Sequence, residues 1–184
     1  KISLTGGVET GRLIMAQSAK SLKKITLELG GKSPLLVFDD CDFDLAVQTA
    51  LDANFYTGGE VCSNATRVFV QRSISDDFIA AMTARTETMR VGDPMASDTQ
   101  MGALISKRHL AKVLNYVKIG VDEGASIVTG GNALQPQGCE NGYFMQPTIL
   151  TNCHDDMRVV REEIFGPVMS VLIFDDEDEA IRRA

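Results

Sequence analysis

The sequence has 184 residues, of which 44% are hydrophobic, so the chain can bury the core of one domain together with a small appendage. Its net charge is −7 and it contains no basic cluster, which argues against binding to nucleic acid or to an anionic membrane surface. No apolar run is long enough to cross a bilayer and no signal peptide is visible, so we expect a cytoplasmic protein that does not bind membranes.

The cysteines and histidines form no metal-binding pattern. The two histidines, His109 and His154, lie far apart and beside no cysteine or carboxylate cluster, so we expect no metal site. There are four cysteines, none of them in a C-x-x-C pair, and we expect all four to be reduced thiols: Cys41, Cys62, Cys139 and Cys153.

The first predicted elements are a short strand over residues 1–5, a turn at Gly6-Gly7 and a helix over residues 8–18. A strand, a glycine turn and a helix N-terminus can hold a phosphate on backbone N–H groups. Gly6 and Gly7 do not complete the dinucleotide-binding fingerprint, so the turn alone is weak evidence. The strand would present an unpaired edge, and we expect this segment to pack anomalously or to exchange between chains.

Glu28 lies in an apolar run, Ile25 to Leu29, that ends at Gly30-Gly31. Aliphatic surroundings make a carboxylate a better proton acceptor, as a general base must be. The alternation of Ile25, Leu27 and Leu29 also fits a half-buried strand with Glu28 directed to solvent. Both interpretations stay open from the residues alone.

A buried strand is predicted over residues 35–38, followed by a helix that begins at Asp42 or Asp44 and ends at Phe55. The two glycines Gly58 and Gly59 then precede Cys62, and a strand is predicted over residues 67–71. A cysteine in a glycine-rich turn is accessible to a substrate and to backbone N–H donors, which suits a nucleophile. The alternative is a small apolar residue that packs at an element junction.

The remaining pattern alternates helices and strands. A proline at position 147 predicts that the strand over residues 143–150 is an irregular or edge strand. The other predicted elements are a helix over 74–90, a loop over 91–106, a helix capped by Ser106 that ends at Gly124, a strand over 126–129, a polar loop over 130–142, a strand over 168–174 and a helix over 176–184. This order predicts an α/β fold with a largely parallel sheet flanked by helices.

Two motifs give the chain a resemblance to a known family. The segment L-E-L-G-G-K-S-P at 27–34 and the segment G-G-E-x-C at 58–62 resemble the glutamate and cysteine motifs of the aldehyde dehydrogenase superfamily, and their separation is the family's. The resemblance implies that Cys62 is the catalytic nucleophile and that Glu28 is the general base. It also implies that residues 1–30 are a remnant of an NAD-binding domain and residues 31–184 a C-terminally truncated catalytic domain.

A third motif, E-E-I-F-G-P at 162–167, resembles the family segment that contacts the nicotinamide end of the cofactor. The resemblance implies that Glu163 binds the nicotinamide ribose hydroxyls and that Phe165 packs beside the nicotinamide. A carboxylate that accepts ribose O–H groups makes charge-assisted hydrogen bonds, which are the stronger class. The implied cofactor is NAD, with NADP possible. Further implied cofactor contacts are Thr5, Gly6, Gly7 and Leu29.

The segment from Phe55 to Val70 resembles the branch of the family that acts on betaine aldehyde and trimethylaminobutyraldehyde, although that branch usually has Gln where this chain has Glu60 and Gly where it has Ala65. The implied reaction oxidises a small aldehyde through a thiohemiacetal and a thioester on Cys62, and the implied parent is a homo-oligomer. We expect the isolated 184-residue chain to be inactive. Two other classes stay open: a cysteine-dependent acyl hydrolase and a non-catalytic structural module.

Overall fold

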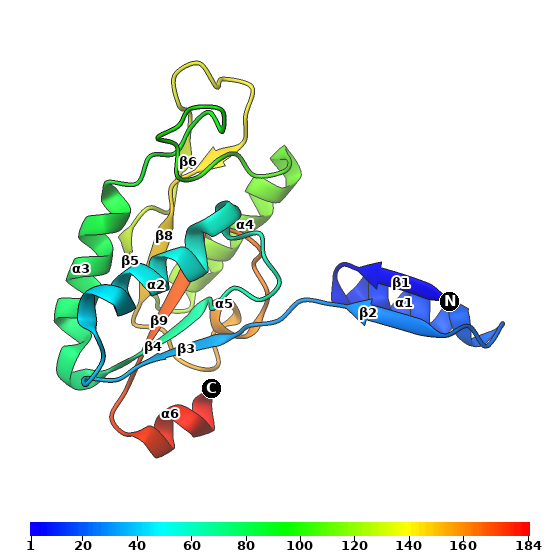
Figure 1. Cartoon of the computed structure of the whole chain (residues 1–184), viewed down its shortest axis with the longest axis horizontal. Helices are drawn as coiled ribbons and strands as arrows, with labels where there is room; N and C mark the ends of the chain where they lie inside the picture. The colour runs from blue at the N-terminus through cyan, green and yellow to red at the C-terminus, as the bar shows by residue number, and fades with distance from the viewer. The chain divides into compact units, whose positions relative to one another are not determined.

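The computed structural model describes residues 1–184 and divides them into two units, Lys1–Gly31 and Lys32–Ala184 (Figure 1). No helix in it combines the length and the apolar character that crossing a membrane requires. The division falls at the paired glycines after Leu29. That the first unit belongs to an NAD-binding domain remains a prediction.

The first unit contains two strands and one helix. Strand β1 (Ile2–Thr5) pairs in parallel with β2 (Ile25–Glu28), and helix α1 (Val8–Ala19) connects them, as the strand–turn–helix pattern predicts. Only two residues of α1, Gly11 and Ser18, are buried. The unit therefore has almost no core of its own.

The second unit is built on a five-stranded sheet in the order β3-β4-β9-β8-β5. The first four strands are mutually parallel, and β5 runs antiparallel to β8 at the edge. The predicted α/β fold with a largely parallel sheet is thus confirmed. The strands of this sheet are β3 (Pro34–Val37), β4 (Arg67–Gln71), β5 (Ser126–Thr129), β8 (Thr148–Thr151) and β9 (Val168–Phe174).

Helices cover both faces of this sheet, and a small hairpin of β6 (Ala133–Leu134) and β7 (Phe144–Met145) forms a separate sheet. The α-helices are α2 (Phe43–Phe55), α3 (Ser75–Glu87), α4 (Lys107–Asp122), α5 (Arg158–Arg161) and α6 (Glu177–Arg183), and the 3-10 turns are η1 (Tyr56–Gly59) and η2 (Arg72–Ile74). The predicted caps are confirmed, since Asp42 accepts from the Leu45 N–H and Ser106 from the His109 N–H.

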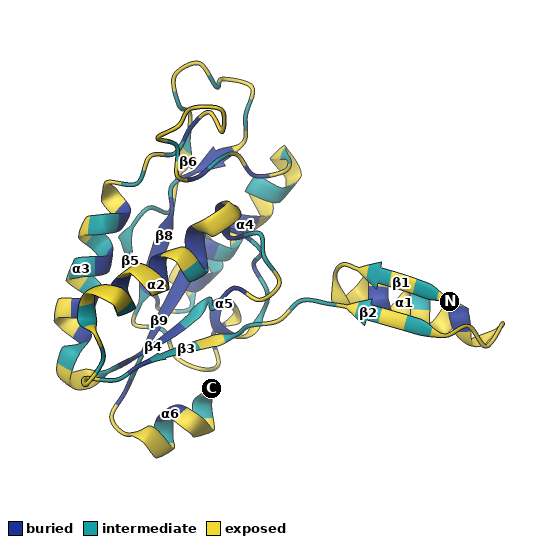
Figure 2. Cartoon of the chain, in the orientation of Figure 1, coloured by how far each residue is buried: buried dark blue, intermediate teal, exposed yellow.

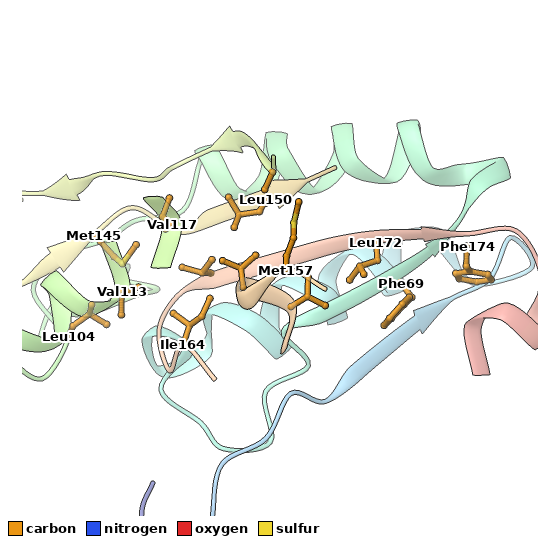
Figure 3. Close-up of a cluster of buried hydrophobic side chains, with 14 of the residues drawn as sticks. Phe69, Leu104, Val113, Val117, Met145, Leu150, Met157, Ile164, Leu172 and Phe174 are labelled. Carbon is orange, nitrogen blue, oxygen red and sulfur yellow. The ribbon is translucent and has the colours of Figure 1, made fainter. Parts of the chain in front are cut away.

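The core lies on both faces of the sheet, because alternate residues of each strand point in opposite directions. Val68 and Val70 of β4 pack with residues of α2 and α3, whereas Phe69 between them packs with residues of α4 and α5. Figure 2 shows the central strands as buried, and Figure 3 shows the cluster around Phe69.

Two predictions for the strands had different outcomes. The irregularity predicted at Pro147 is confirmed, because the stretch 143–150 forms two strands, β7 and β8, but β8 is not an edge strand and lies inside the sheet between β9 and β5. Pro147 precedes β8, so its missing N–H removes no hydrogen bond from the sheet. The strand predicted as buried over residues 35–38 is the edge strand β3, in which only Val37 is fully buried, because β3 pairs with β4 alone.

Helix predictions failed mainly at their ends. Helix α3 ends at Glu87 rather than Arg90, and Met89 lies beyond it and is half-buried. Helix α2 ends at Phe55 as predicted; Leu45 in its first turn is 63% exposed, whereas Val47 and Leu51 are buried. The buried side of α2 therefore begins in the second turn of the helix.

Candidate active site

Cys62 lies in a turn that the preceding glycines shape. Helix α2 ends at Phe55, and three successive residues, Thr57, Gly58 and Gly59, then have left-handed backbone angles, with φ of 50°, 66° and 72°. Glycine adopts this conformation without steric penalty, which explains two of the three positions. The Cys62 side chain is exposed, and no backbone carbonyl accepts from its amide N–H. The thiol and one N–H donor are therefore both accessible at the same turn.

Asn54 joins the helix before this turn to the segment that leads into β4. Its side-chain Nδ2 donates to the carbonyl of Ala50 at 2.8 Å and to that of Ala65 at 3.1 Å. Asn54 is fully buried. Sequence reasoning missed this residue, although an amide on the apolar face of α2, beside Leu51 and Phe55, is a signal that could have identified it.

Buried polar atoms without a hydrogen-bond partner concentrate around this turn. Four of the six such atoms in the chain belong to residues 54–66, and they are Asn54 Oδ1, Glu60 Oε1, Asn64 Nδ2 and Thr66 Oγ1. Unpaired buried polar groups are rare in folded proteins and are often found at functional sites. Their clustering marks the segment around Cys62 as the unusual part of the unit.

The cysteine turn packs directly against the segment Phe165–Pro167. A Cβ atom added to Gly59 would lie 2.3 Å from the carbonyl oxygen of Gly166, and one added to Gly166 would lie 2.7 Å from Cγ2 of Val113 in α4. Three segments that are distant in sequence thus meet with glycines at both contacts. The structure brings two of the predicted motifs together, the one that carries Cys62 and the one that carries Phe165.

His109, in the first turn of α4, joins the same two segments. Its Nε2 atom lies 3.1 Å from Glu60 Oε1 and 2.5 Å from the carbonyl oxygen of Phe165. Phe165 has a left-handed φ of 61°, which is rare for an aromatic residue, and its ring lies edge-on to the imidazole at 6.3 Å. Sequence reasoning considered His109 only as a metal ligand and did not predict this contact.

The adjacent residues Glu162 and Glu163 have different surroundings. Glu162 accepts hydrogen bonds from Arg158, at 2.8 and 3.0 Å, and from the Tyr116 hydroxyl at 2.7 Å. These bonds, the one from Arg158 above all, lower the pKa of Glu162 to about 2. Glu163 is half-buried and its side chain makes no hydrogen bond or ion pair, although it is near enough to Lys32 to affect that group. Of the two, Glu163 is therefore the one whose oxygens can accept from a ligand.

The remaining predicted site residues belong to the first unit. Thr5 pairs with Glu28 across the β1–β2 ladder, and the Gly6 N–H donates to the Glu28 carbonyl at 3.0 Å. Gly7 is the N-cap of α1 without a side-chain cap, and a Cβ atom there would meet nothing within 4 Å. The carboxyl ends of β1 and β2 therefore lie beside an open helix N-terminus.

Glu28 itself is exposed on the outer side of β2. Of the two interpretations left open for Glu28, the half-buried strand with its carboxylate directed to solvent fits this unit, because β2 alternates and Ile25 and Leu27 occupy its inner side. Leu29 packs inward against Gly11, whose added Cβ would lie 2.9 Å from Cδ2 of Leu29.

Comparison with known proteins identifies relatives over the whole chain. The model of the aldehyde dehydrogenase family matches residues 1–184. The chain is 54% identical over 184 residues to betaine aldehyde dehydrogenase of Vibrio vulnificus (strain YJ016) and 53% identical over 186 residues to 4-trimethylaminobutyraldehyde dehydrogenase of Bos taurus. Each match covers 100% of this chain but 38% of the relative, so the chain spans well under half the length of these proteins.

Solved structures agree with these matches. A crystal structure of betaine aldehyde dehydrogenase from Staphylococcus aureus in complex with NAD+ superposes with a TM-score of 0.96 at 44% identity, over 98% of this chain and 36% of that one. The NAD+ complex of an aldehyde dehydrogenase from Bacillus cereus superposes with a TM-score of 0.95 at 42% identity, over 100% of this chain and 36% of that one. The fold therefore matches that of the corresponding part of these enzymes over nearly the whole chain.

Proposed function

The chain belongs to the aldehyde dehydrogenase family, and we propose that it carries the nucleophile and part of the cofactor site of an NAD-dependent enzyme that oxidises an aldehyde to a carboxylic acid. The observation that carries the proposal is the exposed Cys62 in a glycine turn packed against the segment of Glu163 and Phe165. The relatives named above favour betaine aldehyde or a related aminoaldehyde as the substrate.

The residues present fit a nicotinamide cofactor. Glu163 is half-buried, and its carboxylate accepts no hydrogen bond from another side chain of the unit, so its oxygens can accept hydrogen bonds from ribose hydroxyls. Phe165 presents an aromatic ring beside the cysteine turn, held by its backbone contact with His109. In the first unit, Thr5, Gly6 and Gly7 lead into an uncapped helix N-terminus, a geometry that accepts phosphate oxygens. Leu29 contributes packing against α1.

The proposed reaction begins at Cys62. Its thiolate adds to the aldehyde carbon, and the resulting oxyanion accepts a hydrogen bond from the free Cys62 N–H. Bound NAD would supply the hydride acceptor, so that the thiohemiacetal becomes a thioester on Cys62. Glu28 then takes a proton from the water that attacks the thioester, which releases the carboxylic acid and restores the thiol. Two easier steps thus replace one difficult step.

Competitive alkylation tests the role of Cys62. We expect iodoacetamide at pH 7 to modify Cys62 faster than the other three cysteines, as mass spectrometry of the 184-residue chain would show. Cys62 is the exposed thiol, whereas the others are half-buried. Burial raises the pKa of Cys41, and it raises the pKa of Cys153 to about 11, which makes Cys153 roughly a hundredfold poorer in thiolate than an ordinary cysteine. The proposal fails if Cys62 is modified last.

The 184-residue chain can also be assayed for the oxidation of an aldehyde. Because the chain spans 38% of the matched relatives, we expect no steady oxidation of betaine aldehyde with NAD by the chain alone. Formation of NADH at an enzymatic rate, roughly 1–1000 per second, would contradict this expectation. Hydrolysis of an activated ester that needs Cys62 but not NAD would instead favour an acyl hydrolase, and the variant Cys62→Ser is the control for both assays.

A further inference from the structure

The Glu60 carboxylate lies close to one imidazole nitrogen, that of His109. Its Oε1 atom is buried and accepts no well-formed hydrogen bond, and His109 Nε2 lies 3.1 Å from it. The side chains of both residues are largely buried, with 14% of His109 and 20% of Glu60 exposed. A buried carboxylate oxygen without a donor is destabilising, so this contact favours one position of the acid.

The same nitrogen also faces a second acceptor. The carbonyl oxygen of Phe165 lies 2.5 Å from His109 Nε2. Because both neighbours of Nε2 are acceptors, this nitrogen must carry a hydrogen, whatever the state of Nδ1. One imidazole N–H therefore lies between the acid that precedes Cys62 by two residues and the backbone of the Phe165 segment.

We propose that His109 is a positioning residue for the cysteine turn: its Nε2–H holds the Glu60 carboxylate against the Phe165 carbonyl and so keeps that negative charge from opposing thiolate formation at Cys62. The proposal rests on the function proposed above for Cys62. It concerns the contact geometry of three segments, which also meet at Gly59, Gly166 and Val113. His109 touches no reacting atom and acts only through Glu60 and Phe165.

The alkylation rate of Cys62 in three variants tests the proposal. In His109→Ala the Glu60 carboxylate loses its donor, and we expect the rate at which iodoacetamide modifies Cys62 at pH 7 to fall by about three- to tenfold. In the double variant Glu60→Gln/His109→Ala the charge is removed, and the rate should return to within about twofold of that of the unmodified chain. In His109→Gln the amide N–H group can still donate to both acceptors, so the rate should also be kept within about twofold.

The chain offers matched controls. His154 is its only other histidine and is exposed, so His154→Ala should leave the Cys62 rate unchanged. Half-buried Cys153, whose pKa burial raises, reports unfolding, because its own alkylation would accelerate if a variant lost its fold. The proposal is overturned if folded His109→Ala reacts as fast as the unmodified chain, or if the double variant stays as slow as His109→Ala.

Nitrogen-15 NMR of the imidazoles separates this proposal from the function on which it rests. We expect His109 to hold its proton on Nε2, with a downfield resonance that shifts in Glu60→Ala, where the Phe165 carbonyl remains as its acceptor, while His154 serves as the exposed reference. If Cys62 proves unreactive, the proposed function fails, and the NMR result still decides whether the contact exists. A His109 with its proton only on Nδ1 overturns the inference.

Discussion

Lys32 and Cys153 are two ionisable residues whose surroundings oppose their charged forms. The Lys32 amine donates to the Val159 carbonyl at 2.8 Å. Burial, followed by the positive charge of Arg67, lowers the pKa of Lys32 to about 8, although Cys153 and Glu163 act in the other direction. Burial raises the pKa of Cys153 to about 11. The folded chain therefore favours a neutral amine and a neutral thiol.

These shifts predict opposite slopes of stability with pH. Between pH 8 and about 10.5 the folded state binds fewer protons at Lys32 than the unfolded state, so its contribution to the free energy of unfolding rises with pH. Between about pH 9 and 11 the folded state binds more protons at Cys153, so that contribution falls. Where the two ranges overlap, the two slopes should largely cancel.

Urea unfolding of two variants would separate the slopes. We expect Cys153→Ala to gain stability from pH 8 to 10, and Lys32→Met to lose stability from pH 9 to 11, each by on the order of 1 kcal/mol after allowance for partial exposure. Other groups that titrate in both variants affect their stabilities equally, so they cancel in the difference between the two free energies of unfolding. Parallel pH curves for Lys32→Met and Cys153→Ala would show that neither group is perturbed in this way.

At the scale of elements, the cysteine turn depends on the close approach of two glycines. Gly59 has a φ of 72°, and a Cβ atom there would meet the backbone of Gly166 and Pro167, which cannot move aside as a flexible side chain can. Gly138 has a similar φ of 80° but lies in an exposed loop where a Cβ atom would meet nothing within 4 Å. The two positions thus share a backbone conformation and differ in their packing.

Alanine substitutions at these glycines should separate the two effects. Gly138→Ala should lower the free energy of unfolding by about 1 kcal/mol, because only the left-handed backbone angle is strained. Gly59→Ala should lower it by about 3 kcal/mol or more, because the turn must also move away from Gly166. Thermal or urea unfolding measures both. Equal losses in the two variants would mean that the contact with Gly166 is not tight.

Individual elements show what the sequence could predict. The bounds of β4 and β9 were predicted correctly, because each is a run of β-branched and aromatic residues that ends at polar positions. The N-terminus of α4 was equally clear from its serine cap. The place of β8 inside the sheet was not predictable. Pro147 lacks an N–H and so suggested an edge strand, and the pairing of β8 with β9 that places it inside the sheet is a long-range contact.

The candidate site was predicted in the same uneven way. The cysteine and glutamate motifs are local patterns and could be recognised in the sequence. The contacts of Asn54 with Ala65 and of His109 with Glu60 and Phe165 join segments that only folding brings together. Glu28 shows the converse, because its apolar neighbours in sequence face the other side of β2 and leave its own side chain exposed.

At the scale of the whole molecule, the two units differ in how many hydrophobic side chains they bury. All buried hydrophobic side chains of the chain belong to residues 32–184. The first unit pairs only two strands, and α1 leaves large apolar side chains exposed, among them Leu13 at 63% and Met15 at 54%. Two strands and one helix rarely form a stable domain alone.

Hydrogen exchange should therefore distinguish the units. We expect amides of β1 and β2 to exchange within seconds to minutes at pH 7, while those of β4 and β9 exchange only through unfolding of the larger unit. A shortened chain of residues 32–184 is the matched control, and it should keep the slow amides and the unfolding midpoint of the longer chain. Equal protection of β1 and β9 would show that the first unit is as stable as the second.

The strand order has a consequence for synthesis on the ribosome. Strand β9, at 168–174, lies between β4 and β8 and pairs with both, so the middle of the sheet is translated after its neighbours. Until it emerges, a nascent chain exposes the unpaired edges of β4 and β8 and the apolar side chains that β9 covers. Such edges invite aggregation. Newly made copies should thus need chaperone shielding until β9 has emerged from the ribosome.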